Sequence, residues 1–265
     1  MLRPRIIPCL LIQDGGLVKT IQFKDPKYVG DPINAVKIFN EKEVDELIVL
    51  DIDASIRGYE PNYKIIAKLA AECRMPLCYG GGVRNVDQAK KISRLGVEKV
   101  AISSLAIENP ILISHIAAEI GSQSVTVILD VKADLFGGTN IWIHNGTINT
   151  GRSLFEFIKE VESRGAGEIV INSIEFDGKM KGYNLDLVKK VRYATKLPLT
   201  VLGGAGSLSD FKALIQTCGT IGAAAGSFFV FKGPLRAVLI SYLSKDQKEL
   251  LFDISSNFNL KEQLQ

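Results

Sequence analysis

The chain has 265 residues, of which 46% are hydrophobic and 23% are charged. This length suits one α/β barrel of about 250 residues, and the composition is that of a globular protein. A formal net charge of +3 argues against nucleic-acid binding, which requires a clustered basic face. The four cysteines lack paired spacing and there are only two histidines, so we expect no metal site.

The N-terminal segment differs from a signal peptide. Arg3 and Arg5 precede the apolar run Ile6–Ile12, but this run contains Pro8 and no small-residue cleavage site follows it. No stretch approaches the roughly 20 apolar residues of a membrane span. Scattered single cysteines fit a reducing compartment. We therefore expect a soluble, cytoplasmic protein.

Short runs rich in β-branched residues alternate with amphipathic segments along the chain. Several short runs are apolar throughout, as in strands buried on both faces. The predicted strands are Arg5–Leu11, Glu46–Asp51, Pro76–Tyr79, Lys99–Ile102, Val125–Leu129, Glu168–Ile171, Leu199–Leu202 and Gly222–Ala225. The predicted helices between them are Asp31–Asn40, Tyr63–Cys73, Val86–Leu95, Asn109–Ile120, Ser153–Arg164, Leu185–Ala194 and Ser209–Thr217. This strict alternation predicts a parallel sheet, either closed or doubly wound.

An internal repeat favours the closed form. The segment Tyr79–Arg84 is matched 123 residues later by Leu202–Ser207, and Ala101–Ser104 is matched at the same interval by Ala224–Ser227. The third and fourth strands are therefore repeated as the seventh and eighth. The sequence predicts an α/β fold, a (β/α)8 TIM barrel built from two (β/α)4 halves. We expect a single domain over residues 1–265, with 248–265 as a C-terminal extension.

Glycine-rich turns follow the repeated strands. Backbone N–H groups in such turns can approach an anion because no Cβ intervenes, and barrels commonly bind phosphate after strands seven and eight. One predicted phosphate grip consists of Gly204, Ala205, Gly206, Gly226 and Ser227, and its repeat consists of Gly81, Gly82, Ser103 and Ser104. Turn geometry alone is the alternative explanation for these glycines. Two grips in repeat register predict a ligand with phosphate at both ends.

Several colinear motifs together resemble the cyclase subunit of imidazole glycerol phosphate synthase over nearly the whole chain. They are Arg5–Leu10, Leu50–Ser55, Gly80–Val83, Ile107–Pro110, Asn149–Gly151, Arg164–Ile169 and Asp177–Tyr183. The resemblance implies a barrel without a cofactor that receives ammonia from a glutaminase docked at its N-terminal face. The ammonia crosses the barrel axis and attacks a bisphosphorylated nucleotide derivative. The resemblance also places Lys19 in a mobile loop over the active site, and Asp177 and Gly178 among the phosphate-binding residues.

In that family, two aspartates at the ends of strands one and five act as general acid and base, and one of them is missing here. Asp130 stands at the second position, where partial burial would raise its pKa toward that of a useful proton shuttle. The first position is Leu11, whose side chain cannot transfer a proton, and the amide of Gln13 does not titrate. Losing one member of such a pair costs a factor of about 100 to 10,000. We therefore expect the cyclase activity to be reduced or lost.

The ammonia entrance implied by the resemblance is complete. The family closes the barrel bottom with two basic and two acidic residues, which correspond to Arg5, Glu46, Lys99 and Glu168. Their charges cancel, so the side chains can pair in a desolvated ring, although a purely stabilising salt-bridge cluster would use the same residues. An intact entrance beside a lost catalytic acid predicts an ammonia conduit with altered chemistry at its far end.

A branch of this family, found in pathways for bacterial surface polysaccharides, fits that pattern. The resemblance to this branch implies that the barrel passes glutaminase-derived ammonia to a sugar amidotransferase or synthetase that builds an acetamidino group. It also implies a phosphorylated small-molecule ligand. Two alternatives stay open: the histidine-pathway cyclase itself, and a non-catalytic allosteric scaffold for a glutaminase.

Overall fold

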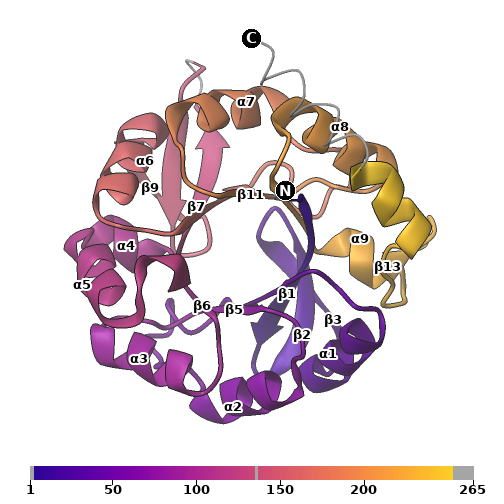
Figure 1. Cartoon of the computed structure of the whole chain (residues 1–265), viewed down its shortest axis with the longest axis horizontal. Coiled ribbons are helices and arrows are strands. Elements are labelled where there is room, and N and C mark those ends of the chain that lie inside the picture. The colour runs from indigo at the N-terminus through magenta and orange to yellow at the C-terminus, as the bar shows by residue number, and fades with distance from the viewer. Residues whose placement is uncertain (1–2, 135–136, 253–265) are drawn as a thin grey trace.

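Eight parallel strands form a closed barrel in the computed structural model, which describes residues 3–134 and 137–252 (Figure 1). The barrel strands are β1 (Arg5–Gln13), β4 (Leu47–Asp51), β5 (Leu77–Gly80), β6 (Lys99–Ile102), β7 (Val125–Ala133), β10 (Glu168–Ser173), β11 (Leu199–Leu202) and β12 (Gly222–Ala225). Each strand pairs in parallel with the next, and β12 pairs with β1, so the sheet closes on itself. The predicted (β/α)8 barrel is confirmed.

Helices follow the strands and cover the outside of the barrel (Figure 1). They are α1 (Pro32–Glu41), α2 (Tyr63–Glu72), α3 (Val86–Arg94), α4 (Ser104–Glu108), α5 (Ile111–Ile120), the 3₁₀ helix η1 (Ser122–Ser124), α6 (Leu154–Ser163), α7 (Leu185–Ala194), α8 (Leu208–Cys218) and α9 (Ser227–Val230). The carboxylate or amide side chains of Asp31, Asn62, Asn85 and Asn184 cap four of them by accepting a backbone N–H three residues later. The predicted helix Asn109–Ile120 begins only at Ile111.

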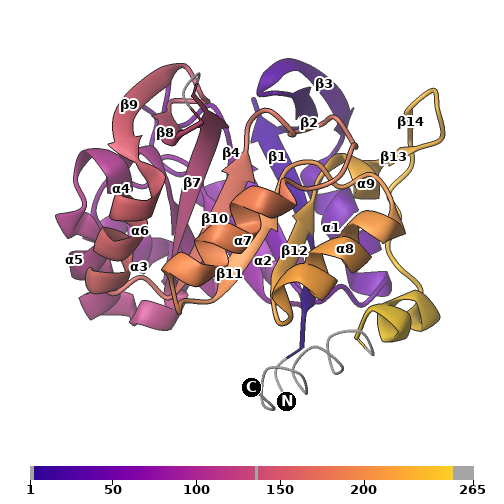
Figure 2. The same cartoon turned by 90° about the horizontal axis from the view of Figure 1, so that it is seen from above.

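Three hairpins were not predicted from the sequence. They are β2–β3 (Gly16–Ile21 and Lys24–Gly30), β8–β9 (Thr139–Ile143 and Ile148–Ser153) and β13–β14 (Phe231–Lys232 and Ala237–Val238). The barrel strands β1 and β7 continue past the barrel and pair with β2 and β8 in antiparallel fashion. These hairpins rise from the C-terminal end of the barrel, whereas the helical residues 245–252 lie at the opposite end (Figure 2).

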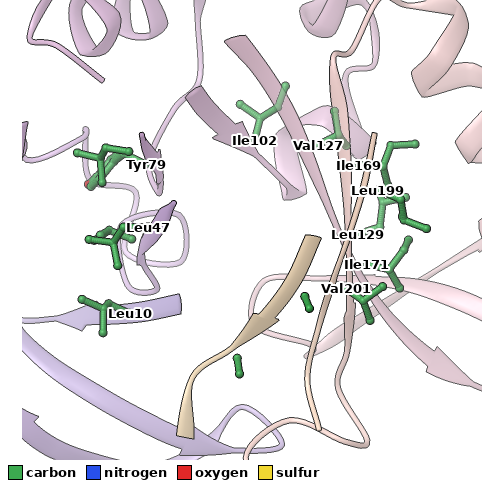
Figure 3. Packing of buried hydrophobic residues seen from close by; sticks show 14 of the residues in the cluster. Leu10, Leu47, Tyr79, Ile102, Val127, Leu129, Ile169, Ile171, Leu199 and Val201 are labelled. Atoms are coloured by element: carbon green, nitrogen blue, oxygen red, sulfur yellow. The ribbon is translucent and has the colours of Figure 1, made fainter. Parts of the chain in front are cut away.

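Alternation along the strands divides the core into two parts. Ile6 and Leu10 of β1 point outward toward the helices, whereas Ile7 and Cys9 point into the barrel. Figure 3 shows part of the outer core, to which successive strands contribute buried hydrophobic side chains such as Leu10, Leu47 and Tyr79. The inner core, which we call the bore, consists of Ile7, Cys9, Ile48, Cys78, Ala101, Ile128, Val170, Leu202 and Ala224. The barrel axis is therefore apolar between its two ends.

Candidate functional site

A pocket of about 130 Å³ opens at the C-terminal end of the barrel strands. Active sites of TIM-barrel enzymes lie at this end. A single buried water needs only about 10–15 Å³, so the pocket has room for a ligand. Its floor has an apolar and a polar half. The apolar half comprises Leu11, Leu50 and Leu202, and the polar half comprises Ser103, Asp130 and Asn172.

Asp130 is held in the pocket by Asn172. The two residues face each other across β7 and β10, and the Asn172 Nδ2 group donates a hydrogen bond of 2.9 Å to Asp130 Oδ1. Burial raises the pKa of Asp130 to about 7, although the hydrogen bond from Asn172 acts in the opposite direction. A carboxyl group with this pKa can take up or release a proton near neutral pH.

Leu11, at the position where the resemblance implies an aspartate, lines the pocket from β1 with an apolar side chain. Neighbouring polar side chains do not replace it. The Gln13 amide donates to Asp53 Oδ1 at 3.0 Å, and Asp14 forms an ion pair of 2.6 Å with Arg57. The side-chain amide of Gln13 therefore bonds Asp53 and does not line the pocket.

A further acid in the pocket, Asp51, was missed by the sequence analysis. It ends β4, and its side chain accepts hydrogen bonds from the backbone N–H groups of Asp53 and Ala54. Burial raises its pKa, with the two backbone hydrogen bonds acting in the opposite direction. Its position at the C-terminal end of a predicted strand was the available signal.

Lys19 lies in strand β2, so the expectation of a mobile loop was wrong. Asp14 and Gly15, both with positive φ, form a tight turn that folds β2 back onto β1. The Lys19 side chain lines the pocket and is 6% exposed, and its ammonium group donates to the Cys9 carbonyl. Burial lowers the pKa of Lys19, against the opposing effects of Cys9 and Asp177.

Asp177 holds the β2–β3 hairpin. The Thr20 hydroxyl donates to Asp177 Oδ2 at 3.0 Å, and the carboxyl group lines the main pocket. Burial raises the pKa of Asp177, while the positive charge of Lys19 and the Thr20 hydrogen bond lower it. Asp177 and Gly178, the predicted pair, both line the smaller cavity beside the second grip.

The first phosphate grip faces the main pocket with all four predicted residues, Gly81, Gly82, Ser103 and Ser104. Gly81 has a φ of 124°, and a Cβ there would lie 2.5 Å from the Asp51 carbonyl oxygen, so this turn requires glycine. The Ser104 hydroxyl accepts the backbone N–H of His144 at 3.1 Å. The structure thus brings the first grip together beside Asp130.

The second grip surrounds a smaller cavity that shares Asp177, Leu202 and Gly226 with the main pocket. Gly178, Gly204, Ala205, Gly226 and Ser227 line it. Gly206 does not line it: its N–H donates at 2.8 Å to the Asp210 carboxylate, which also accepts the Ser207 N–H in the capping box of α8. The structure therefore does not bring Gly206 to this cavity, and its role as a phosphate ligand stays a prediction.

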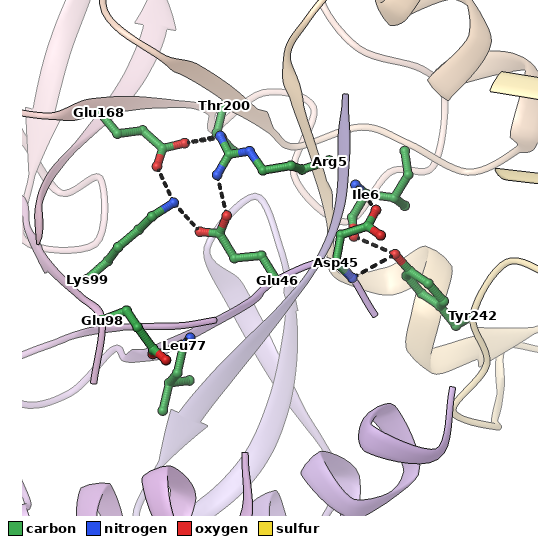
Figure 4. Close-up of polar contacts among 10 residues, drawn as sticks. All are labelled: Arg5, Ile6, Asp45, Glu46, Leu77, Glu98, Lys99, Glu168, Thr200 and Tyr242. Carbon is green, nitrogen blue, oxygen red and sulfur yellow. Dashed lines mark hydrogen bonds and ion pairs between the residues drawn. The ribbon is translucent and has the colours of Figure 1, made fainter. Parts of the chain in front are cut away.

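The four residues predicted to form a charged ring meet at the N-terminal end of the barrel (Figure 4). Arg5 pairs with Glu46 and, at 2.6 Å, with Glu168, while Lys99 pairs with both carboxylates at 2.7 Å. Thr200 donates a further hydrogen bond of 2.6 Å to Glu168. Burial would raise the pKa of Glu168, but Arg5 and Lys99 outweigh it and hold that pKa at about 2. The ring is therefore a closed set of ion pairs below the apolar bore.

Comparison with known proteins assigns the family. Residues 5–235 match the family model of histidine biosynthesis proteins. The chain belongs to this family. A Leptospira borgpetersenii protein with the provisional name imidazole glycerol phosphate synthase subunit HisF is 60% identical over 253 residues, which cover 95% of this chain and 100% of that protein. The resemblance drawn from the motifs is thereby confirmed.

Two further relatives show the range of this HisF family. A Pseudomonas aeruginosa protein, provisionally named imidazole glycerol phosphate synthase subunit hisF2, is 52% identical over 242 residues, which cover 91% of this chain and 96% of that protein. The imidazole glycerol phosphate synthase subunit HisF of Natranaerobius thermophilus is 38% identical over 250 residues, which cover 94% of this chain and 99% of that protein. The higher identity to the provisionally named proteins fits a divergent branch. Among residues 3–134 and 137–252, no helix is long and apolar enough to cross a membrane.

Proposed function

We propose that this HisF-family chain conducts ammonia from a glutaminase subunit through the barrel, and that its own cyclase chemistry is reduced or lost. One combination of features carries the proposal: the ring of Arg5, Glu46, Lys99 and Glu168 is intact, whereas Leu11 occupies the position of a catalytic aspartate. The chain thus has the charged ring at the N-terminal end of the barrel but only one of the two family aspartates at the C-terminal end. Conduction of ammonia needs the ring and does not need the pair of aspartates.

The route runs along the barrel axis. A glutaminase docked at the N-terminal face would release ammonia next to the charged ring, and the bore would lead it to the pocket. An apolar passage favours neutral ammonia over ammonium, because an unpaired charge is costly to desolvate. The bore ends beside Leu11 and Leu50, which pack against it, so ammonia would enter the pocket at the level of Asp130.

The acceptor in this proposal is a sugar that receives the nitrogen as an acetamidino group, during synthesis of a surface polysaccharide. A separate sugar amidotransferase or synthetase would perform that reaction. Lone Asp130 cannot provide both proton transfers of the family cyclisation, which supports an acceptor reaction elsewhere. The two phosphate grips would bind a phosphorylated or nucleotide-linked ligand, for which the retained glycine turns are suited.

The variant Lys99→Ala tests conduction. It removes one cation from the ring and leaves Glu46 and Glu168 with a single cationic partner, Arg5. In the complex with the glutaminase, we expect less ammonia to reach the acceptor per glutamine hydrolysed, while the reaction with added ammonium chloride persists. Lys196→Ala is the matched control, since Lys196 is exposed in the connection that leads into β11. Unchanged coupling in Lys99→Ala would refute conduction through the ring.

The histidine-pathway cyclase is the second candidate, favoured by Asp130 with its pKa of about 7. It is tested with the bisphosphorylated family substrate and excess ammonium salt, which makes a glutaminase unnecessary. We expect slow turnover by the wild type and an increase of roughly 100-fold to 10,000-fold in Leu11→Asp, because a second titrating group restores the acid–base pair. Leu11→Asn, which has the same shape but does not titrate, should stay slow. Wild-type turnover near one per second, roughly an ordinary enzymatic rate, would establish the cyclase instead.

A further inference from the structure

Exposed apolar side chains gather at the C-terminal end of the barrel. In the described part of the chain, the hairpins β2–β3 and β13–β14, with the residue after β14, and the connection from β4 to α2 expose the large hydrophobic side chains of Ile21, Tyr28, Ile56, Tyr59, Leu235 and Leu239. We call these six residues the apolar rim. Tyr28 is 65% exposed and Leu235 is 92% exposed. Single exposed hydrophobic residues are normal, but a group of them at one end of a barrel marks an interaction surface.

The apolar rim borders the mouth of the pocket. Ile21 follows Thr20, and Ile56 follows Ser55, and both preceding residues line the pocket. Phe23, at the tip of the hairpin that carries Ile21, lines the pocket as well. Figure 2 shows the β2–β3 and β13–β14 hairpins at the same end of the barrel. A protein that covered the rim would therefore also close the pocket against water.

Contacts between the segments hold the rim in a fixed arrangement. Lys27 Nζ lies 5.4 Å and Arg236 Cζ 4.6 Å from the centre of the Phe231 ring, so cation–π contacts join the β2–β3 hairpin to β13–β14. Arg57 pairs with Asp14 at 2.6 Å and joins the connection after β4 to the turn before β2. A surface that is already ordered loses less entropy when a partner binds. The rim is therefore suited to docking without rearrangement.

The charges beside the rim are mostly positive. Lys24, Lys27 and Lys232 are exposed on the two hairpins, and Arg236 is partly buried there. Asp25 is the one acidic residue in the sequence of these hairpins, 16–30 and 231–238. Complementary charges favour association and like charges oppose it. A partner that fits this surface therefore combines apolar side chains with carboxylates.

We propose that the apolar rim is the docking surface for the enzyme that uses the ammonia, a sugar amidotransferase with an acidic and apolar surface around its own active-site entrance. This inference rests on the proposed conduction of ammonia and adds the place where the acceptor enzyme binds. Ammonia released into water takes up a proton and is lost as a nucleophile. Direct contact between the two entrances avoids this loss. The phosphate grips use other residues than the rim, so docking leaves them available to a ligand.

Binding of the purified sugar amidotransferase to the full-length chain, measured by surface plasmon resonance, tests the proposal. Leu235→Glu and Ile56→Glu each place a carboxylate on a different segment of the rim, where it repels an acidic partner. We expect each variant to weaken binding at least about tenfold, and added salt to weaken the wild-type complex. Tyr193→Glu is the matched control and should bind as the wild type does, because Tyr193 lies on α7 outside the rim and is 92% exposed.

Amidination by the assembled complex gives a second readout. In Leu235→Glu we expect less glutamine-dependent amidination, whereas amidination with added ammonium chloride and binding of the glutaminase should stay at the wild-type level. Wild-type affinity for the amidotransferase in both rim variants, or no binding by the wild type, would overturn the docking surface. Self-association of the chain, or binding to phosphatidylglycerol vesicles, that Leu235→Glu abolishes would overturn it in favour of a second copy or a membrane.

These outcomes are separable from the test of conduction. If Lys99→Ala leaves coupling unchanged while the rim variants lose the amidotransferase, conduction through the ring is refuted and the docking surface stands. If Lys99→Ala reduces coupling while both rim variants bind as the wild type does, the docking surface alone is refuted.

Discussion

At the scale of single residues, the leucine at position 11 changes the environment of the remaining acid. A second carboxyl group or its water shell would keep the pocket floor polar, but Leu11, Leu50 and Leu202 line it instead. An apolar environment disfavours the charged form of a carboxyl group. The raised pKa of Asp130, which burial causes, agrees with this apolar surrounding.

This raised pKa has a measurable effect on stability. The pKa of Asp130 is about 7 in the folded chain against 3.8 for an unperturbed aspartate, so folding takes up a proton between these values. Stability therefore falls as pH rises from about 4 to about 7, and the full cost, on the order of 4 kcal/mol, persists above pH 7. We expect Asp130→Asn to be more stable than wild type at pH 8 and to lose this advantage near pH 4. Urea unfolding of both proteins from pH 4 to pH 8 measures this advantage. A difference in stability that does not change with pH would contradict the raised pKa of Asp130.

Much of the site could be predicted from single residues at strand ends. The resemblance to the family pointed to Asp130 and to the ring residues, and the glycine turns of the internal repeat pointed to the first phosphate grip. Their places at opposite ends of the barrel follow from the rule that barrel strands begin at one face and end at the other. The burial of Lys19 and the hydrogen bond of the Gly206 N–H could not be predicted in this way. The first depends on how the β2–β3 hairpin folds over the pocket, and the second on a hydrogen bond to Asp210 that competes with any ligand.

At the scale of elements, Tyr242 and Lys248, which follow the last barrel strand, bind the N-terminal end of the barrel. The Tyr242 hydroxyl donates to the Ile6 carbonyl at 2.7 Å and accepts the Asp45 N–H at 3.3 Å. Lys248 pairs with the Asp45 carboxylate at 2.5 Å, and this carboxylate also accepts the Ile6 N–H. Figure 4 shows Tyr242 and Asp45 beside the ring. The predicted extension 248–265 therefore starts inside a docked helix, 245–252, and residues 253–265 lie outside the described part.

The Tyr242 hydroxyl should contribute to stability through these bonds. Tyr242→Phe keeps the aromatic side chain but removes the hydroxyl that binds the Ile6 carbonyl and the Asp45 N–H. We expect the free energy of unfolding to fall by about 1–3 kcal/mol, measured by urea denaturation at pH 7. Tyr193→Phe is the control, because Tyr193 is 92% exposed and its hydroxyl faces solvent. If both variants have the same free energy of unfolding, the hydrogen bonds of the Tyr242 hydroxyl do not contribute to stability.

Element boundaries also show which signals a sequence carries. Barrel strands and amphipathic helices were predicted because their hydrophobic periods differ. The hairpins were not, since β3 is mostly exposed and β9 has no buried residue, so neither shows a hydrophobic pattern. One helix boundary was misplaced by two residues, because the helix predicted over Asn109–Ile120 begins at Ile111, with Pro110 as its N-cap.

At the scale of the whole molecule, both halves of the repeat contribute to each end of the barrel. Arg5, Glu46 and Lys99 come from the first half and Glu168 from the second, so the ring closes only when the halves are joined. At the other end, the first half supplies one phosphate grip and the second half supplies the other. A ligand with two phosphates would consequently hold the halves together across the pocket.

Such a ligand should stabilise the barrel by binding to both grips at once. With the bisphosphorylated family substrate at 100 times its Kd, we expect about 2.7 kcal/mol of added stability, seen as a rise in Tm. Ser104→Asp and Ser227→Asp place a negative charge in one grip each, at the first residue of α4 and α9, where an acidic side chain is compatible with the helix. Each single variant should lose most of the shift, because one phosphate is then repelled, and the double variant should lose all of it. If one single variant keeps the full shift, that grip binds no phosphate, and the ligand of this barrel is charged at one end only.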